Sequence, residues 1–302
     1  MENTLKTANS AASHRDLVRI PAHAERIDLH CHSKLSDGSL TPTELILRAH
    51  TMQIEVLALT DHDSLSSYRA ACEAQLEHDL TSPVLIPGVE ISCLWNGYEI
   101  HILGWNFSVD NSALQGLIDD QQRKRRERSV AIYEKLVQQG VQAADLPDVT
   151  SMAPGQVLTR LHFAQALVQA NYCKDIQRAF ERYLGKGQCA YVSSQWCSID
   201  EAIDAIRGAG GVAGLAHPLA YSLSNKWLRK LLVELKQAGA EAMEVVSSQQ
   251  APWQRQWLAE LAQEYGFYMS VGSDFHHPGK YRELGRNLRP PEGVTPVWAL
   301  WQ

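Results

Sequence analysis

Histidine and carboxylate side chains recur near the ends of short apolar runs in this chain of 302 residues. His30 and His32 lie two residues apart in the strand-like run RIDLHCH, so both should point to one face and Cys31 to the other. Asp274 and His276 repeat this spacing in SDFH. Buried ionisable groups are costly without partners, and a mixture of imidazole and carboxylate groups suits divalent metal ions. The spacing therefore indicates metal-dependent chemistry, with Cys31 serving only in packing.

Further candidate ligands follow other apolar runs or lie within them: Asp37, Asp61, His62, Glu90, His101 and His217. A single histidine at the end of a strand is more often an ordinary hydrogen-bonded group than a ligand. Two same-face pairs, combined with acids and histidines after successive apolar runs, are an improbable result of packing alone. We therefore expect these residues to hold metal ions jointly.

The elements that must position these residues alternate between short apolar runs and helix-like stretches from Arg26 onward. This alternation is typical of βα units around a parallel sheet. Thr41, Pro42 and Glu44 predict a helix start, because they form a Thr-x-x-Glu capping box with proline in the first turn. In an α/β barrel the carboxyl ends of the strands assemble the active site, which would bring the candidate ligands together.

The chain divides into four predicted segments. Residues 1–25 are polar and irregular and predict a loosely ordered extension, followed by the first part of a barrel over residues 26–107. Residues 108–187 are rich in charged helical stretches and predict an all-helical insertion that binds substrate. The second part of the barrel is expected over residues 188–302.

Composition limits the classes of partner. A formal net charge of −6 and a pI near 6.1 argue against a protein that grips long duplex DNA through a broad basic face. We find neither the apolar core of a signal peptide nor a segment of membrane-spanning length. Six cysteines without a CxxC pair suit a reducing compartment, so a cytoplasmic location is expected. The sequence indicates no protein partner.

The motifs DLHCHSKLSDG, LTDHD, PGVE, EIHILG, LAHP and GSDFH, taken together, resemble the PHP (polymerase and histidinol phosphatase) superfamily of metal-dependent phosphoesterases. The resemblance extends from Arg26 to the SDFH segment. TRLHFA and YVSSQWCSIDEAI resemble the branch of 3′,5′-nucleoside bisphosphate phosphatases and the 5′–3′ exoribonuclease RNase AM. The resemblance to this superfamily implies an α/β fold, a distorted seven-stranded (β/α) barrel with an all-helical insertion.

The same resemblance implies three clustered metal sites that use nine residues. One site would take His30, His32, Glu90 and Asp274, a second would share Glu90 and add His101 and His217, and a third would take Asp37, His62 and His276. Two to three divalent ions are therefore expected, manganese first, with iron and zinc as alternatives because no thiolate is present. Such ions would activate water for attack on phosphorus.

The insertion contains the densest basic run of the chain, from Arg123 to Arg128. Such a run is usually a solvated helix face. The resemblance instead assigns Arg125, Arg128 and Arg160, with His162 nearby, to a phosphate of the substrate. Asp63 and His162 are candidates for protonating the leaving oxygen. One departure is visible, because the branch often has Gly-Arg-Tyr where this chain has Leu219, Ala220 and Tyr221.

The expected function is hydrolysis of nucleoside 3′,5′-bisphosphates, with release of the 5′-phosphate or cleavage on its 5′ side, and of the 5′ ends of short single-stranded RNA. Two alternatives stay open at this point. One is a histidinol-phosphate or other small phosphomonoester phosphatase. The other is a noncatalytic RNA-binding protein stabilised by metal ions.

Overall fold

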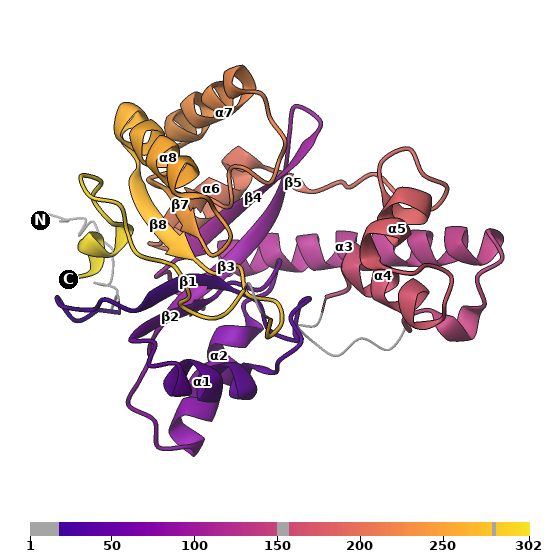
Figure 1. Cartoon of the computed structure of the whole chain (residues 1–302), viewed down its shortest axis with the longest axis horizontal. Coiled ribbons are helices and arrows are strands. Elements are labelled where there is room, and N and C mark those ends of the chain that lie inside the picture. Colours follow the sequence, from indigo (N-terminus) through magenta and orange to yellow (C-terminus); the bar gives the residue numbers. More distant parts are fainter. Residues whose placement is uncertain (1–17, 150–156, 280–281) are drawn as a thin grey trace, which may run out of the picture.

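The computed structural model describes residues 18–149, 157–279 and 282–302. Most of the extension expected over residues 1–25 therefore lies outside the described residues. Within them, seven strands form one nearly closed barrel in the order β1-β2-β3-β4-β6-β7-β8, and a two-residue strand pairs with β3 (Figure 1). The strands are β1 Ile27–Cys31, β2 Val56–Leu59, β3 Val84–Trp95, β4 Tyr98–Trp105, β5 Cys197–Ser198, β6 Val212–Leu215, β7 Ala242–Ser247 and β8 Tyr268–Gly272.

The barrel closes where β1 lies beside the chain that leaves β8. The backbone N–H of Asp274 donates to the carbonyl of His30 at 2.8 Å, and that of His32 donates to the carbonyl of Phe275 at 2.9 Å. The fully buried Trp105 donates its indole N–H to the carbonyl of Leu29 across the interior at 2.8 Å. The predicted distorted seven-stranded α/β barrel is confirmed.

The expectation of a purely parallel sheet is wrong at β4, which runs antiparallel to both β3 and β6. Asn96 and Gly97 both have positive φ, 46° and 80°, which suits a two-residue hairpin between β3 and β4. As a result Glu90 lies within the long strand β3 rather than just past a strand end, whereas His101 lies within β4, inside a strand as expected.

Helices cover the outside of the barrel (Figure 1). They are α1 Pro42–Thr51, α2 Ser66–Glu77, α6 Ile199–Gly208, α7 Asn225–Ala238 and α8 Pro252–Tyr265. The predicted start of α1 is confirmed, because Thr41 accepts from the N–H of Glu44 and the Glu44 carboxylate accepts from the N–H of Thr41. A 3₁₀ turn, η3 Val297–Trp301, packs against the core near the carboxyl terminus.

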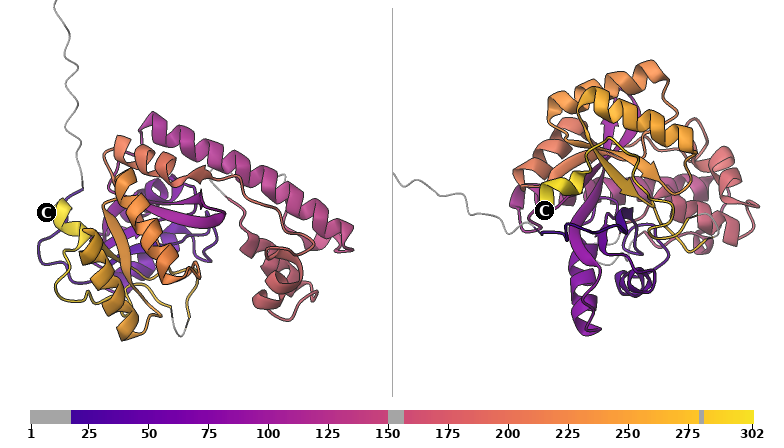
Figure 2. Two further views of the ribbon diagram at one scale, coloured as in Figure 1. Left: turned by 90° about the horizontal axis from the view of Figure 1, so that it is seen from above. Right: turned by 60° about the vertical axis from the view of Figure 1, so that its left-hand side comes forward.

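Between β4 and β5 the described elements are helical: α3 Ser112–Gln138, η1 Ala143–Asp145, α4 Arg160–Gln169, α5 Ile176–Ala179 and η2 Phe180–Leu184. Figure 2 shows α3 running outward from the barrel, with α4 and α5 beside its far half. Ile132, Leu136, Phe163 and Leu167 build a small apolar core there, separate from that of the barrel. In the part of the chain that the structure describes, we find no helix both long and apolar enough for a membrane span.

Candidate metal centre and adjoining cavity

The strand β1 and the residue that follows it direct His30 and His32 into the barrel, where both side chains are buried. Their Nε2 atoms lie 3.1 Å apart. Cys31, between them, points the other way into an apolar cluster with Leu45 and Leu57. The alternation of a strand thus separates two inward imidazoles from an outward packing thiol.

Glu90 is the hub of the cluster and is fully buried. Its two carboxylate oxygens lie between 2.8 and 3.4 Å from a nitrogen of each of five histidines: His217 (2.8 Å), His101 (2.9 Å), His62 (3.1 Å), His32 (3.2 Å) and His30 (3.4 Å). These histidines come from β1 and the residue after it, from β4, and from the loops after β2 and β6. One side chain on β3 therefore joins the ligands of four chain segments.

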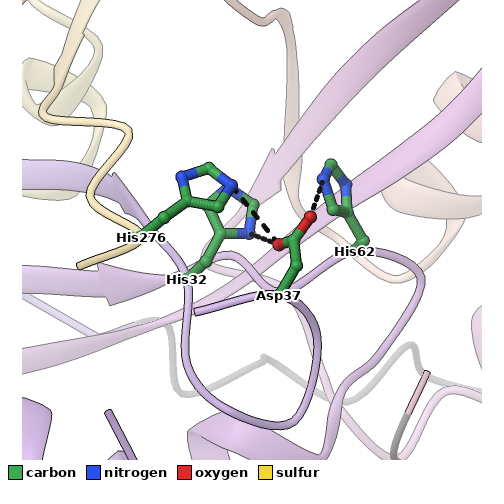
Figure 3. A group of neighbouring side chains, drawn as sticks. All are labelled: His32, Asp37, His62 and His276. Carbon is green, nitrogen blue, oxygen red and sulfur yellow. Dashed lines mark ion pairs between the residues drawn. The ribbon is translucent and has the colours of Figure 1, made fainter. Parts of the chain in front are cut away.

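Asp37 forms a second focus, between His62 on one side and His32 and His276 on the other (Figure 3). Its carboxylate lies 3.3 Å from Nε2 of His276, 3.6 Å from Nε2 of His62 and 3.7 Å from Nδ1 of His32. On the other side, Asp274 lies 3.5 Å from Nε2 of His32 through its Oδ1 atom. Two further carboxylates thus flank the histidines around Glu90.

The nine residues expected to bind metal all lie in this cluster. Their ligand atoms form four overlapping groups: His32, Asp37, His62 and His276; His30, His32 and Asp274; His30, Glu90 and His217; and His62, Glu90 and His101. The groups differ in detail from the division implied by the resemblance, because His32 also joins Asp37 and His62 also joins Glu90. Which residues share which ion stays a prediction.

Several of these atoms are buried without a hydrogen-bond partner, and they test whether metal ions fit. Oε2 of Glu90, Nδ1 of His62 and Nδ1 of His217 are such atoms. Nδ1 of His62 lies 3.1 Å from Oε2 of Glu90, yet the geometry gives no hydrogen bond. Leaving buried polar atoms unpaired is costly, and divalent ions would satisfy them. The donors are nitrogen and oxygen atoms, which several divalent ions accept.

The pKa values of the cluster are set by two opposing effects, burial of each group and the charges of its neighbours. Burial would raise the pKa of Glu90, but His62, His101 and His30 outweigh it and hold that pKa well below its usual range. Burial would lower the pKa of His32, but Asp274 and Glu90 raise it to about 10. For His62 burial wins, and its pKa falls well below the usual value. A cation bound at Asp274 and Glu90 would take the place of the proton that these two carboxylates favour on His32.

Two buried acids support the cluster without belonging to it. Glu244 on β7 lies 3.3 Å from Nδ1 of His30 through both oxygens and accepts the backbone N–H of His217 at 2.6 Å. Sequence reasoning missed Glu244, although a charged residue inside the apolar run AMEVVS was a usable signal. Asp61, considered as a ligand above, instead accepts from Ser33 and Ser36 and shapes the loop that carries Asp37.

A cavity of about 170 Å³ adjoins the cluster, between the barrel and the helical insertion. It is lined by three candidate metal ligands, three arginines and several other side chains: Asp37, His62, His101, Arg125, Arg128, Arg160, Ser92, Glu99, Thr159, Leu161, Phe180 and Trp196. The arginines predicted to bind phosphate therefore face the same space as the metal ligands.

Arg125 is held rigidly in this wall. Its Nε donates to Oδ2 of Asp63 at 2.6 Å, and its Nη2 donates to the hydroxyl of Ser92 at 2.6 Å. Oδ1 of Asp63 accepts the backbone N–H of Ser92. Asp63 is fully buried in these contacts. The structure therefore does not support Asp63 as a proton donor to the leaving group, and makes it an anchor for Arg125.

His162 also differs from its expected place. Its Nδ1 accepts the backbone N–H of Thr159 at 3.0 Å and closes the capping box of α4. Its side chain lines a separate surface depression with Gln165 and Ala166, not the arginine cavity. Burial lowers the pKa of His162. Asp37 and Arg125 are nevertheless close enough to influence the charge of His162, so phosphate binding and proton transfer by His162 stay predictions.

Arg128 and Arg160 meet at Glu99, a residue that sequence reasoning missed. Nη2 of Arg128 lies 3.1 Å from Oε1 of Glu99, and Nη2 of Arg160 lies 2.6 Å from Oε2. Trp196 lies beneath both Arg125 and Arg128, 4.8 and 5.2 Å from the guanidinium carbons to the ring. Glu99 carries no sequence signal apart from its spacing of two from His101.

The segment that departs from the branch pattern supports the centre through its tyrosine. The hydroxyl of Tyr221 accepts the backbone N–H of His101 at 3.0 Å and donates to the carbonyl of Ala216 at 3.0 Å. Leu219 packs against the apolar core of the barrel. Neither Leu219 nor Ala220 offers a cation to the site.

Comparisons with known proteins agree with this architecture. The PHP domain family matches residues 28–184. A 5′–3′ exoribonuclease of Haemophilus influenzae is 43% identical over 91% of this chain and 98% of its own length, and a 3′,5′-nucleoside bisphosphate phosphatase of Chromobacterium violaceum is 34% identical over 90% and 95%. A solved structure from Chromobacterium violaceum, described as an amidohydrolase with bound sulfate and no metal, superposes with a TM-score of 0.83 at 33% identity, over 91% of this chain and 95% of that one. The chain belongs to the PHP domain family.

Proposed function

We propose that this protein is a metal-dependent phosphoesterase that hydrolyses nucleoside 3′,5′-bisphosphates and the 5′ ends of short single-stranded RNA. The observation that carries the proposal is the cavity shared by His62 and His101 of the metal cluster and by three arginines. A substrate with two phosphates on one nucleotide would place one at the metal centre and the other at the arginines. The names of the exoribonuclease and the bisphosphate phosphatase relatives agree with such a substrate.

The nine clustered histidines and carboxylates would hold two to three divalent ions, manganese first, because the set offers nitrogen and oxygen donors without a thiolate. Such ions supply an activated water and stabilise negative charge on phosphate oxygens. The chain itself orients the ligands through Glu244 and Asp61 and holds the second phosphate at the insertion, residues 108–187. Metal analysis of the purified protein tests the identity and number of the ions.

Degradation of RNA in the 5′–3′ direction decides which phosphate lies at the metal ions and which lies at the arginines. If the 5′-terminal phosphate lay on the metals, hydrolysis would release inorganic phosphate and no nucleotide. With the terminal phosphate on Arg125, Arg128 and Arg160, water instead breaks the bond between the next phosphorus and the 3′ oxygen. This releases a nucleoside 5′-monophosphate and leaves a new 5′-phosphate on the shortened RNA, ready for the next cycle. A 3′,5′-bisphosphate would likewise lose its 3′-phosphate, the reverse of the assignment expected from the sequence.

The alternative substrates fit the cavity less well. Histidinol phosphate has only one phosphate, so with that phosphate at the metal centre it would offer no second anion to the three arginines of the cavity. A noncatalytic RNA-binding protein stabilised by metal ions would use the same buried ligands, but the relatives of this chain are named as an exoribonuclease and a phosphatase, which favours catalysis. A cytoplasmic location belongs to the proposal, since the cysteines of the chain are free thiols.

The test is hydrolysis of a panel with added manganese: a 3′,5′-bisphosphate, the matching 3′- and 5′-monophosphates, histidinol phosphate and a short 5′-phosphorylated RNA. We expect fast release of the 3′-phosphate from the bisphosphate and of nucleoside 5′-monophosphates from the RNA. Arg160→Ala should lower kcat/KM on the bisphosphate by roughly ten- to a hundredfold, the size of a lost charge-assisted hydrogen bond, and change 3′-monophosphate hydrolysis little. Equal losses on both substrates, or a preference for histidinol phosphate, would contradict the proposal.

A further inference from the structure

Glu99 places a negative charge inside a cavity that otherwise attracts phosphate. It lies on β4 two residues before His101, so both side chains point to the same face of the strand. Both residues line the cavity. A carboxylate at this position repels phosphate, since like charges repel across a partly desolvated site. Its presence in the cavity therefore calls for a role.

The contacts of Glu99 come from two helices of the insertion and from the segment that returns to the barrel. Arg128 of α3 and Arg160 of α4 each donate to one carboxylate oxygen, at 3.1 and 2.6 Å. The hydroxyl of Ser194, on the segment returning to β5, donates to Oε1 at 2.5 Å. The Glu99 side chain is only 23% exposed. The barrel thus holds both arginines in place through one ionised group.

These contacts limit the positive charge available to a ligand. In the arginine part of the cavity, leaving out Asp37 of the metal cluster, three guanidinium groups face the carboxylates of Asp63 and Glu99, which leaves a formal surplus of one positive charge. A 5′-monophosphate carries about −1.5 to −2 at neutral pH. Every further phosphate of a 5′-triphosphate adds about one negative charge, which the balanced cavity does not compensate.

Resting on the proposed function, we infer that Glu99 is a specificity-determining residue that restricts the arginine cavity to 5′-monophosphorylated RNA ends and disfavours 5′-triphosphorylated ends. Glu99 does so through the charge that it adds to the cavity and not through the size of its side chain. Glutamine has nearly the same shape as glutamate, so Glu99→Gln separates these two explanations.

The experiment measures kcat/KM for two oligoribonucleotides of one sequence, bearing a 5′-monophosphate or a 5′-triphosphate, with manganese present. In Glu99→Gln the ratio of triphosphate to monophosphate hydrolysis should rise about tenfold over wild type. Glu99→Asp keeps the charge and should keep the wild-type ratio, even if both rates fall. Glu134→Gln removes the same charge from an exposed position of α3 and is the matched control, with no change in ratio expected.

Both substrates are measured on one preparation, so the ratio does not depend on the fraction of folded protein. An unchanged ratio in Glu99→Gln overturns the inference, as does an equal shift in Glu134→Gln. Wild-type protein that cleaves neither RNA nor bisphosphate overturns the proposed function instead. The two failures are therefore distinguishable.

Discussion

The metal centre and the arginine cavity adjoin each other but balance their charges in opposite ways. Around Glu90, histidine nitrogens crowd against one another and buried atoms such as Nδ1 of His217 lack hydrogen-bond partners. Around Arg125 and Arg160, each cation already has a carboxylate within the chain. The unpaired atoms of the first region need an added cation. The arginines of the second region are already held in place by ion pairs, so we expect this region to need no added cation before it binds an anion. Substitutions in the two regions should therefore fail in different ways.

The largest effect is expected from Glu90→Gln. This change removes the carboxylate shared by five histidines, so the metal groups on both sides lose a ligand together. We expect kcat/KM to fall by about 10²–10³ or more on every substrate, and metal content per chain to fall as well. Elemental analysis and kinetics on the same preparation measure both, with Cys31→Ala as the control. Full activity after thorough chelation would refute the role of metals.

Glu244→Gln tests whether the centre depends on support from outside the cluster. Glu244 lies against His30 and accepts from the backbone of His217. Supporting carboxylates of this kind are typically worth ten- to a hundredfold in metal affinity, so we expect a loss of about that size. Titration of demetallated protein with manganese measures it. Activity that stays low even at saturating manganese would show that Glu244 affects more than metal binding.

Asp63→Asn separates the anchor role found here from the proton-transfer role expected from the sequence. An anchor for Arg125 should affect only binding of the second phosphate. We expect about a tenfold loss on a 3′,5′-bisphosphate and almost none on a 3′-monophosphate. A proton donor would be needed for both substrates. Equal losses, with a changed acidic or basic limb of the pH–rate profile, would restore the original hypothesis.

The smallest effect concerns stability and pH at Glu99. Burial would raise the pKa of Glu99, but Arg160 and Arg128 outweigh burial and lower it. Its folded pKa lies below its unfolded pKa, so its stabilisation is complete above the unfolded value and is lost as pH falls through the folded value. Glu99→Gln should cost about 1–3 kcal/mol at pH 7, and less below about pH 4. Urea unfolding of both proteins across this range measures the difference, which should not grow on acidification.

The sequence predicted the metal centre better than the cavity because the two regions depend on different kinds of information. His30 and His32 follow from strand alternation, and the motifs around His217 and Asp274 are local. Partners such as Glu99 and Arg160 are separated by 61 residues, and their pairing depends on how the insertion folds back on the barrel. The contact between Asp63 and Arg125 could not be foreseen for the same reason, since Arg125 lies on a distant helix. The antiparallel β4 was hidden because a hairpin strand and a parallel strand have the same apolar pattern.

The β3–β4 hairpin joins the two regions within one rigid ladder. Ser92 pairs with His101 on one rung, and the neighbouring rungs of the same face carry Glu90, paired with Leu103, and Glu99, paired with Leu94. Two residues of strand span roughly 7 Å, and this spacing is fixed by the backbone hydrogen bonds rather than by any side chain. A slip of β4 by one residue would turn Glu99 and His101 to the outer face together. Insertions in this hairpin should therefore be tolerated only at its tip, near Asn96 and Gly97, where they leave the spacing between the metal cluster and Glu99 unchanged.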